Sequence, residues 1–247
     1  MQTRTALVTG ANGGLGTAIA KGLAIEHHMH VLVAARQMPD ARETADALRS
    51  AGGEATPIQL DVSSDESVAK LRTTIEQAGG RLDVLVNNAG RNSMTEQSEA
   101  SLGTVDMKTA LGEFDTNALG ALRVSQASFE LLRKSDAPRV INVSTEMASL
   151  STAATDFYPL APSYRISKVA LNAVTVLLAR EWAKHCILVN AYSPGWLRTA
   201  MGAPEAPYSA DEGAETALWL ATLENNGPTG RFFAEMRRMG QPVVLDW

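Results

Sequence analysis

The chain has 247 residues, a net charge of −5, and 45% hydrophobic and 20% charged residues. This balance is typical of a globular domain and argues against disorder, and the negative charge gives no overall attraction to nucleic acid or anionic membranes. No apolar run has the length of a transmembrane span or the form of a signal peptide, and the single cysteine, Cys186, cannot form an intramolecular disulfide. We therefore expect one cytoplasmic domain over residues 1–247, with no nucleic-acid or membrane partner.

Short β-branched apolar runs alternate with longer amphipathic segments along the chain. The runs lie at 6–8, 31–33, 58–60, 84–86, 140–143 and 187–189, and segments such as 16–26, 42–51, 67–77 and 169–184 carry apolar residues at three- and four-residue spacings. Such runs fit strands buried on both faces, and such spacings fit helices. The succession predicts an α/β, doubly wound Rossmann fold, with a single parallel sheet, helices on both faces, and a ligand crevice beyond the carboxyl ends of the strands.

A glycine-rich turn follows the first expected strand and opens the first expected helix. Glycines let the backbone approach a pyrophosphate, and the helix that follows presents free N–H groups and the positive end of its dipole. The alternative is a plain tight turn. The candidate phosphate-binding residues are Gly10, Asn12, Gly13, Gly14, Leu15 and Gly16.

The end of the second expected strand indicates which dinucleotide is bound. NAD-binding folds usually place an acidic residue there for the ribose hydroxyls, but this sequence reads Ala34-Ala35-Arg36. A guanidinium can pair with a 2′-phosphate, and the strand tip has no carboxylate to repel one. Arg36 therefore favours NADPH over NADH, the alternative being a solvated arginine that opens the next helix.

A tyrosine and a lysine stand four residues apart at the start of an apolar helix. This spacing places Tyr164 and Lys168 on one helix face. A phenol with a pKa near 10 is a poor acid or base at neutral pH, but a neighbouring cation lowers that pKa. Taken alone, the pair also fits an ordinary amphipathic helix, because the spacing is common by chance.

Several motifs, in their order and separations, resemble the short-chain dehydrogenase/reductase family over nearly the whole chain. The motifs are Thr9-Gly10-x-x-x-Gly14-x-Gly16, Asp61-Val62, Asn87-Asn88-Ala89-Gly90, Asn117, Ser144-Thr145, Tyr164-x-x-x-Lys168 and Pro194-Gly195. More narrowly, the stretches 188–196 and 227–233 resemble carbonyl-reductase-like members.

This resemblance implies a role for each residue of the chemical centre. Tyr164 would be the general acid that protonates the carbonyl oxygen while the nicotinamide delivers hydride. Lys168 would lower the pKa of Tyr164 and hold the nicotinamide ribose, and Asn117 would anchor a water that links Lys168 to solvent. The substrate-orienting hydroxyl, usually a serine in the family, falls on Thr145. Ser144 is the alternative, and strand alternation points the two side chains to opposite sides.

The resemblance also extends the expected cofactor site along the chain. It places Asp61 and Val62 at the adenine, Asn88, Ala89 and Gly90 along the adenosine ribose, and Pro194, Gly195 and Thr199 at the nicotinamide, which Tyr164 and Lys168 also border. Three of the assigned sites have a plainer interpretation: Asp61 as a residue near a helix N-terminus, residues 88–90 as a simple turn, and Asn117 as a polar surface residue of an expected helix over 113–132.

Other features are less specific. The proline-bearing stretch 194–208 suggests a mobile lid, and residues 156–159 lie in a long insertion that we expect to shape the substrate pocket. Arg91 either attracts an anionic substrate or is solvated. We expect no metal site, because the clustered histidines lack carboxylate or thiolate partners at ligand spacing; these are His27, His28 and His30.

The activity predicted is reduction of a small-molecule ketone or aldehyde to an alcohol, with NADPH oxidised to NADP⁺. Two alternatives stay open: oxidation of a secondary alcohol with NAD(P), and a non-catalytic NADP(H)-binding sensor or regulatory protein, because a fold does not guarantee chemistry. The resemblance also implies a homodimer or a homotetramer. Substrate identity depends on loops whose shape the sequence does not reveal.

Overall fold

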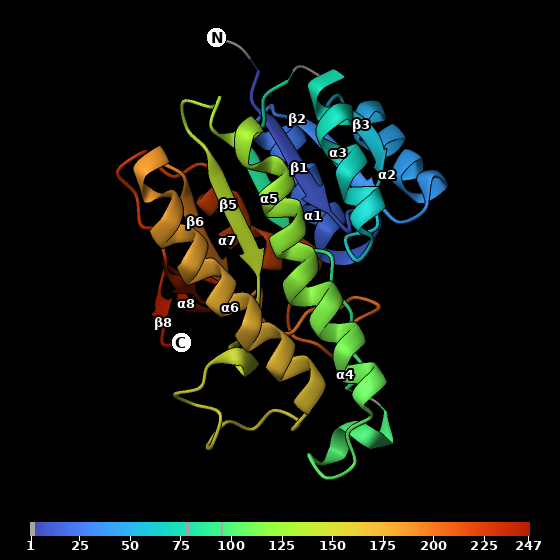
Figure 1. Ribbon diagram of the computed structural model, residues 1–247, viewed down its shortest axis with the longest axis vertical. Coiled ribbons are helices and arrows are strands. Elements are labelled where there is room, and N and C mark those ends of the chain that lie inside the picture. The colour runs from blue at the N-terminus through green and yellow to red at the C-terminus, as the bar shows by residue number, and fades with distance from the viewer. Residues whose placement is uncertain (1–2, 78–79, 95) are drawn as a thin grey trace.

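The strands of the protein form one sheet in the computed structural model, which describes residues 3–77, 80–94 and 96–247 (Figure 1). The strands are β1 (Thr5–Thr9), β2 (His30–Ala35), β3 (Glu54–Gln59), β4 (Val84–Asn87), β5 (Arg139–Val143), β6 (Leu188–Tyr192), β7 (Phe232–Phe233) and β8 (Val244–Leu245). Their order is β3-β2-β1-β4-β5-β6-β7-β8, and neighbours are parallel except for β7 and β8. The doubly wound α/β fold is confirmed, with a short antiparallel edge strand that the sequence did not predict.

Helices cover both faces of this sheet (Figure 1). They are α1 (Gly14–Lys21), α2 (Met38–Ser50), α3 (Asp65–Gln77), α4 (Met107–Phe114), α5 (Gly120–Leu132), α6 (Pro162–Trp182), α7 (Ala210–Ala221) and α8 (Met236–Met239). The described residues include two π-helical turns, Gly22–Glu26 after α1 and Asp115–Leu119 between α4 and α5. The helix expected over 113–132 is therefore α4 and α5 joined by a π-helical turn. It begins earlier than expected because Asp106 accepts a capping hydrogen bond of 2.8 Å from Thr109 N.

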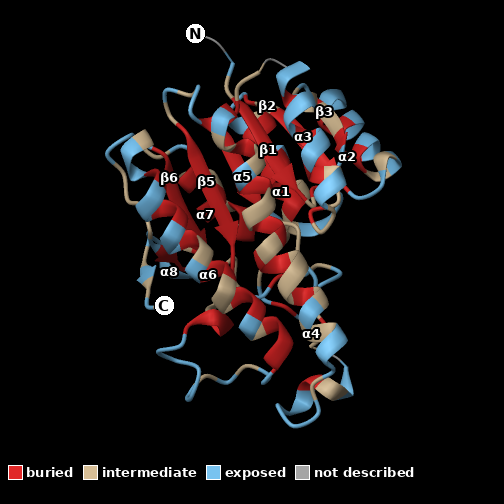
Figure 2. Cartoon of the chain, in the orientation of Figure 1, coloured by how far each residue is buried: buried red, intermediate tan, exposed pale blue. Residues whose placement is uncertain are grey.

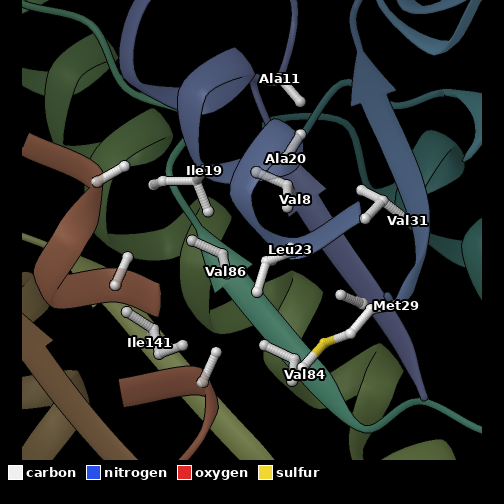
Figure 3. Packing of buried hydrophobic residues seen from close by; sticks show 14 of the residues in the cluster. Val8, Ala11, Ile19, Ala20, Leu23, Met29, Val31, Val84, Val86 and Ile141 are labelled. Atoms are coloured by element: carbon white, nitrogen blue, oxygen red, sulfur yellow. The ribbon is translucent and has the colours of Figure 1, made fainter. Parts of the chain in front are cut away.

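Alternation along each strand divides the core into two layers. In β1, Ala6 and Val8 pack beneath α1, α2 and α7, whereas Leu7 points to the opposite face, beneath α3, α5 and α6. Figure 3 shows Val8 and Val86 of the sheet meeting Ile19 of α1 in the first of these layers. The strands β1, β2, β4, β5 and β6 are buried on both faces, as the continuous apolar runs predicted, whereas the outer strand β3 and the edge strand β8 are partly exposed (Figure 2).

The carboxyl ends of the parallel strands meet at one edge of the sheet. The arrowhead of β5 points to the lower half of Figure 1, where the chain after β4 and the chain after β5 make long excursions. The first excursion contains the 3-10 helix Gln97–Ala100, and the second contains Glu146–Ala148 and leads into α6. No helix in the described part of the chain is long and apolar enough to span a membrane.

Truncating a core side chain of β1 should weaken the fold. Leu7 is completely buried, so Leu7→Ala should lower the free energy of unfolding by roughly 2–5 kcal/mol in urea titrations, through lost burial and a residual cavity. Leu177→Ala is the matched control, because Leu177 is 62% exposed and its truncation should change stability by less than about 0.5 kcal/mol. Equal losses in the two variants would contradict the assignment of Leu7 to the core.

Candidate active site

The glycine-rich turn between β1 and α1 has no room for side chains at three positions. Gly10 and Gly14 have positive φ angles of 63° and 49°. A Cβ on Gly10 would lie 2.9 Å from Ala89 Cα, and a Cβ on Gly16 would lie 2.2 Å from Gly10 O. The first turn of α1 carries no acidic residue, so no side-chain charge there opposes an anion at the helix N-terminus. The turn therefore fits the phosphate-binding role expected of it.

Asn88 fastens this turn to the neighbouring strand. Its Nδ2 donates to Thr9 O at 2.9 Å and to Gly10 O at 3.0 Å. The Thr9 hydroxyl accepts from the backbone N–H groups of Asn88 and Ala89, both at 3.0 Å. The side chain of Asn88 thus holds in place the glycine-rich turn with Gly10, Gly14 and Gly16, which we call the cradle. Thr9, which was not among the expected site residues, joins the two segments, and the signal for it was a hydroxyl residue at the last strand position before the glycine turn.

The structure brings Arg36 and Asp61 together near the ends of β2 and β3. Arg36 is exposed, and its carbonyl accepts from Gln59 Nε2 at 3.2 Å. Hydrogen bonds from Ser63 lower the pKa of Asp61, and the nearby charge of Arg36 lowers it further. Asp61 Oδ1 accepts from Ser63 N at 2.9 Å and from Ser63 Oγ at 2.6 Å. Asp61 therefore organises the turn before α3 as well as lying beside Arg36.

Two neighbours of this region have surroundings that the sequence did not reveal. Val62 is buried, and a Cβ on Gly120 would lie 2.8 Å from its Cγ2, so its side chain packs against α5, and its place at the adenine stays a prediction. The tip of β2 itself has no carboxylate, but Asp40 in the first turn of α2 accepts from Asn12 Nδ2 at 3.4 Å. An acidic group therefore stands close to the glycine turn, a contact that only the fold brings about.

The segment after β6 folds back over the glycine turn. A Cβ on Gly14 would lie 3.0 Å from Thr199 Cγ2, so glycine is needed where the two segments meet. Thr199 Oγ1 accepts from Gly202 N at 3.2 Å, and Arg198 Nη1 donates to Ala206 O at 2.8 Å. These bonds give the stretch 194–208 an internal framework and hold Thr199 beside the cradle. Pro194 and Gly195 lie at its start, half-buried, and Gly195 has a positive φ of 76°.

Tyr164 and Lys168 lie at the heart of the site, on the first turns of α6. Tyr164 is 9% and Lys168 is 5% exposed, and the Lys168 ammonium is 5.9 Å from the centroid of the Tyr164 ring. Lys168 Nζ donates to Val143 O, at the end of β5, at 2.8 Å. A Cβ on Gly90 would lie 3.6 Å from Lys168 Nζ and 3.2 Å from Asn117 Oδ1. The end of β5, the segment after β4 and the first turns of α6 therefore meet around the Lys168 ammonium.

Asn117 is a buried connector and not a surface residue. Its Nδ2 donates to Arg91 O and to Ser167 Oγ, each at 2.9 Å, and its Oδ1 accepts from Arg91 N at 2.8 Å. Ser167 Oγ in turn donates to Tyr164 O at 2.7 Å. Asn117 lies in the π-helical turn, a feature found often at functional sites. Its amide is committed to three protein hydrogen bonds, which join the segment after β4 to α6.

Burial sets the protonation of this pair. Burial raises the pKa of the Tyr164 phenol above its usual value near 10, and it lowers the pKa of Lys168 from 10.5 to about 8. The sequence interpretation expected Lys168 to lower the pKa of Tyr164, and the net direction is the opposite, because removal of the phenolate from water and, after it, the negative charge of Glu113 raise that pKa. Burial therefore favours the protonated form of the Tyr164 phenol at neutral pH.

The two hydroxyls that follow β5 point to different environments. Ser144 is 2% exposed and its Oγ donates to Asn172 Oδ1 at 2.7 Å, so its proton is used inside the fold. Thr145 is half-buried, and its Oγ1 accepts from Met147 N at 3.3 Å. A hydroxyl that accepts still has a proton to donate. This geometry supports Thr145 over Ser144 as the hydroxyl available to a substrate.

An ion pair fastens the segment 150–161 beside Tyr164. The Arg165 guanidinium binds both carboxylate oxygens of Asp156 at 2.7 Å and also donates to the carbonyls of Met147 and Pro159, at 3.0–3.1 Å. The segment brings Tyr158 against the buried cluster that contains Tyr164. Residues 156–159 are therefore held by Arg165, the residue that follows Tyr164, and their part in a substrate pocket stays a prediction.

Three charged residues beside this segment were missed by sequence reasoning. Tyr158 Oη donates to Glu146 Oε2 at 2.8 Å, and Arg238 pairs with Glu146 and, at 2.7 Å, with Glu235. A Cβ on Gly195 would lie 3.3 Å from Glu235 Cδ, so this cluster reaches the start of the 194–208 segment. Its members lie far apart in the sequence, and no motif signals their contact.

The remaining candidates lie at the edge of the site or away from it. Arg91 is exposed, and its guanidinium lies over Gly112, where a Cβ would come within 2.9 Å of Nη1. His27 and His28 are exposed, whereas His30 pairs with Thr56 Oγ1 at 2.8 Å. Within the described ranges, no three His, Cys, Asp or Glu side chains are grouped so that they could hold a metal ion.

Comparison with known proteins places this geometry among relatives. A family model described as short chain dehydrogenase matches residues 4–209. The short-chain dehydrogenase anuI of Penicillium roqueforti is 34% identical over 225 residues, 87% of each chain, and carbonyl reductase [NADPH] 1 of Bos taurus is 31% identical over 277 aligned positions, 98% of each chain. The crystal structure of an NADPH-bound carbonyl reductase from chicken fatty liver matches with a TM-score of 0.85 at 26% identity, covering 100% of both chains.

Removing the buried ammonium should stabilise the fold. A pKa lowered from 10.5 to about 8 corresponds to roughly 3 kcal/mol of destabilisation by the charged form, so Lys168→Met should raise the free energy of unfolding by roughly 1–3 kcal/mol. The effect should be full below pH 8 and shrink as the pH rises from 8 toward 10.5, where folded wild-type Lys168 is already neutral.

Urea unfolding at about pH 6.5 and about pH 9.5 measures the difference between the two conditions. Lys184→Met is the matched control, since Lys184 is exposed and the substitution should leave stability nearly unchanged at both pH values. A Lys168→Met protein that loses stability equally at both pH values would show that burial of the ammonium does not limit the fold.

Proposed function

The chain belongs to the short-chain dehydrogenase family, which comprises oxidoreductases, and on that premise we propose that it reduces a ketone or aldehyde to an alcohol with NADPH. The observation that carries this proposal is the meeting of Tyr164, Lys168, Asn117 and Gly90 at the carboxyl ends of the strands. Carbonyl reductases that carry NADPH in their names or titles are similar to this chain over nearly its whole length. The substrate is a small carbonyl compound, and residues 1–247 act as one catalytic unit.

The residues present fit a dinucleotide with a 2′-phosphate. The cradle of Gly10, Gly14 and Gly16 would hold the pyrophosphate, since side chains at these positions would fill the space it needs. Arg36 is exposed beside Asp61 and would bind the 2′-phosphate. When bound, NADPH supplies the hydride that reduces the carbonyl carbon.

The chain's own side chains supply the proton and orient the substrate. Tyr164 donates its phenolic proton to the carbonyl oxygen, and Thr145 donates a hydrogen bond to the same oxygen. Lys168 places a positive charge beside the phenolate that remains. Asn117 and Ser167 fix the turn of α6 that carries Tyr164, which keeps the proton donor in place.

The raised pKa of Tyr164 supports reduction as the proposed direction. Oxidation of an alcohol would need the phenolate as a base, and burial raises the pKa of Tyr164 and so disfavours the phenolate. A buried phenol ready to donate fits a reductase better than an alcohol dehydrogenase. A binding protein without turnover would have no need of a buried ammonium, which weakens the fold.

Replacing the proton donor should abolish most turnover. Tyr164→Phe should lower kcat by roughly 10²–10⁴-fold against carbonyl substrates, because general acid catalysis contributes about that much. NADPH oxidation followed by absorbance, with thermal unfolding as a control for folding, checks this. Full activity in Tyr164→Phe would overturn the proposed role of Tyr164.

Arg36 should set the choice of nicotinamide cofactor. Arg36→Ala should raise KM for NADPH by roughly 10-fold or more through loss of a charge-assisted contact, and leave KM for NADH little changed. Arg49→Ala is the control, because Arg49 is at the far end of α2 and pairs with Asp46. An unchanged ratio of the two KM values in Arg36→Ala would remove Arg36 from the cofactor site.

A further inference from the structure

One buried carboxyl group beside the site has no role in the chemistry described so far. Glu113, in the last turn of α4, is 0% exposed. Neither of its carboxyl oxygens has a close hydrogen-bond partner among the described residues, and weaker hydrogen bonding from the side chain and backbone of Ser93 offsets its burial only in part. A buried, unpaired carboxylate destabilises a fold unless something compensates for it.

The position of Glu113 ties it to the chemical centre. It precedes Asn117 by four residues, which is one helical turn along the same face, and α4 packs closely against α6. Asn117 reaches Ser167 of α6, so Glu113 lies one turn nearer to the end of α6 that carries Tyr164. Its charge acts on both Tyr164 and Lys168.

The other groups around Glu113 do not neutralise it. Glu99, of the 3-10 helix Gln97–Ala100, is also buried, but its carboxylate is used: it accepts from Ser163 N at 3.0 Å and from Ser163 Oγ at 2.7 Å. Burial and the charge of Glu99 raise the pKa of Glu113, whereas Ser93 and the exposed Arg91 oppose that rise. The charge of Glu113 also acts on the ammonium of Lys168, on α6, the helix against which α4 packs.

We propose that Glu113 is a positioning residue whose ionised carboxylate keeps Lys168 in its ammonium form. Lys168 is buried, so its surroundings favour loss of its proton, and a nearby anion is the means by which a protein opposes that loss. The two groups titrate as a coupled pair. This inference rests on the proposed function, since it explains how the cation beside Tyr164 survives at the pH of the reaction.

The direction of the effect follows from the charges. Burial lowers the pKa of Lys168 to about 8, and the negative charge of Glu113 acts against burial. Without that charge the pKa of Lys168 would fall further, and the ammonium would be lost at a lower pH. Burial also raises the pKa of Glu113, so its ionisation opposes folding, and Glu113→Gln should stabilise the protein where wild-type Glu113 is ionised.

The direct test measures Lys168 in the protein without cofactor. NMR titration of protein labelled with ¹³C at the lysine ε carbons follows the Lys168 resonance, identified by its loss in Lys168→Met. In Glu113→Gln the pKa of Lys168 should be lower than in wild type by about 0.5 or more, which corresponds to roughly a threefold change in its protonation equilibrium. Glu113→Asp keeps the charge and should restore at least part of the difference.

Asp115→Asn is the matched control for loss of one negative charge nearby. Asp115 lies two residues away, but its carboxylate is half-exposed and pairs with Arg123 at 2.8 Å, so this variant should leave the pKa of Lys168 unchanged. The same pKa for Lys168 in wild type and Glu113→Gln would overturn the proposal. So would an equal shift in Asp115→Asn, because the effect would then belong to net charge.

A kinetic readout separates this inference from the proposed function. The pH profile of kcat/KM for NADPH reports groups of the free enzyme, and its alkaline limb should move to lower pH in Glu113→Gln and move back in Glu113→Asp. If the NMR titration shows the lower pKa of Lys168 in Glu113→Gln but the protein reduces no carbonyl compound, the coupling between Glu113 and Lys168 is supported and the proposed reductase activity is refuted. Tyr164-dependent reduction with identical profiles in wild type and Glu113→Gln would support the reductase and refute the coupling.

Discussion

The burial of one ammonium group constrains the whole site. Lys168 is 5% exposed, and its Nζ has a backbone carbonyl, Val143 O, at 2.8 Å. To hold a charge there, the fold brings together the end of β5, the absence of a side chain at Gly90 and the packing of α4 against α6. The same loss of water that lowers the pKa of Lys168 also raises the pKa of Tyr164, so the two pKa changes have one main cause.

Local patterns were sufficient to predict most of the architecture. Strands buried on both faces and amphipathic helices leave distinct periodicities, and β1, Gly14 and Tyr164 could be placed from them and from the glycine motif. The edge strand β8 has two residues, too few for a period to be recognised. The π-helical turn at Asn117 was read as continuous helix, because a single extra residue in a turn leaves apolar spacings nearly unchanged.

The environment of the site residues was harder to predict than their identity. Whether a carboxylate is solvated or buried depends on what the rest of the chain packs against it, and nothing in the residues around Glu113 signals that it is inaccessible. The contact between Glu146 and Arg238 joins residues 92 positions apart. The direction of the pKa change at Tyr164 was wrongly predicted for the same reason. The four-residue spacing predicts that Lys168 lies beside Tyr164, but it does not predict that Tyr164 is buried, and burial raises its pKa.

The ion pair between Arg165 and Asp156 ties the segment 150–161 to the helix that carries Tyr164. Arg165 holds the segment at two points, the carboxylate of Asp156 and the carbonyl of Pro159, and between them Tyr158 is bonded to Glu146. Phe157 is 88% exposed, so little of the interior depends on it. A substitution at Phe157 can therefore change the surface beside Tyr164 and leave the anchorage of the segment unchanged.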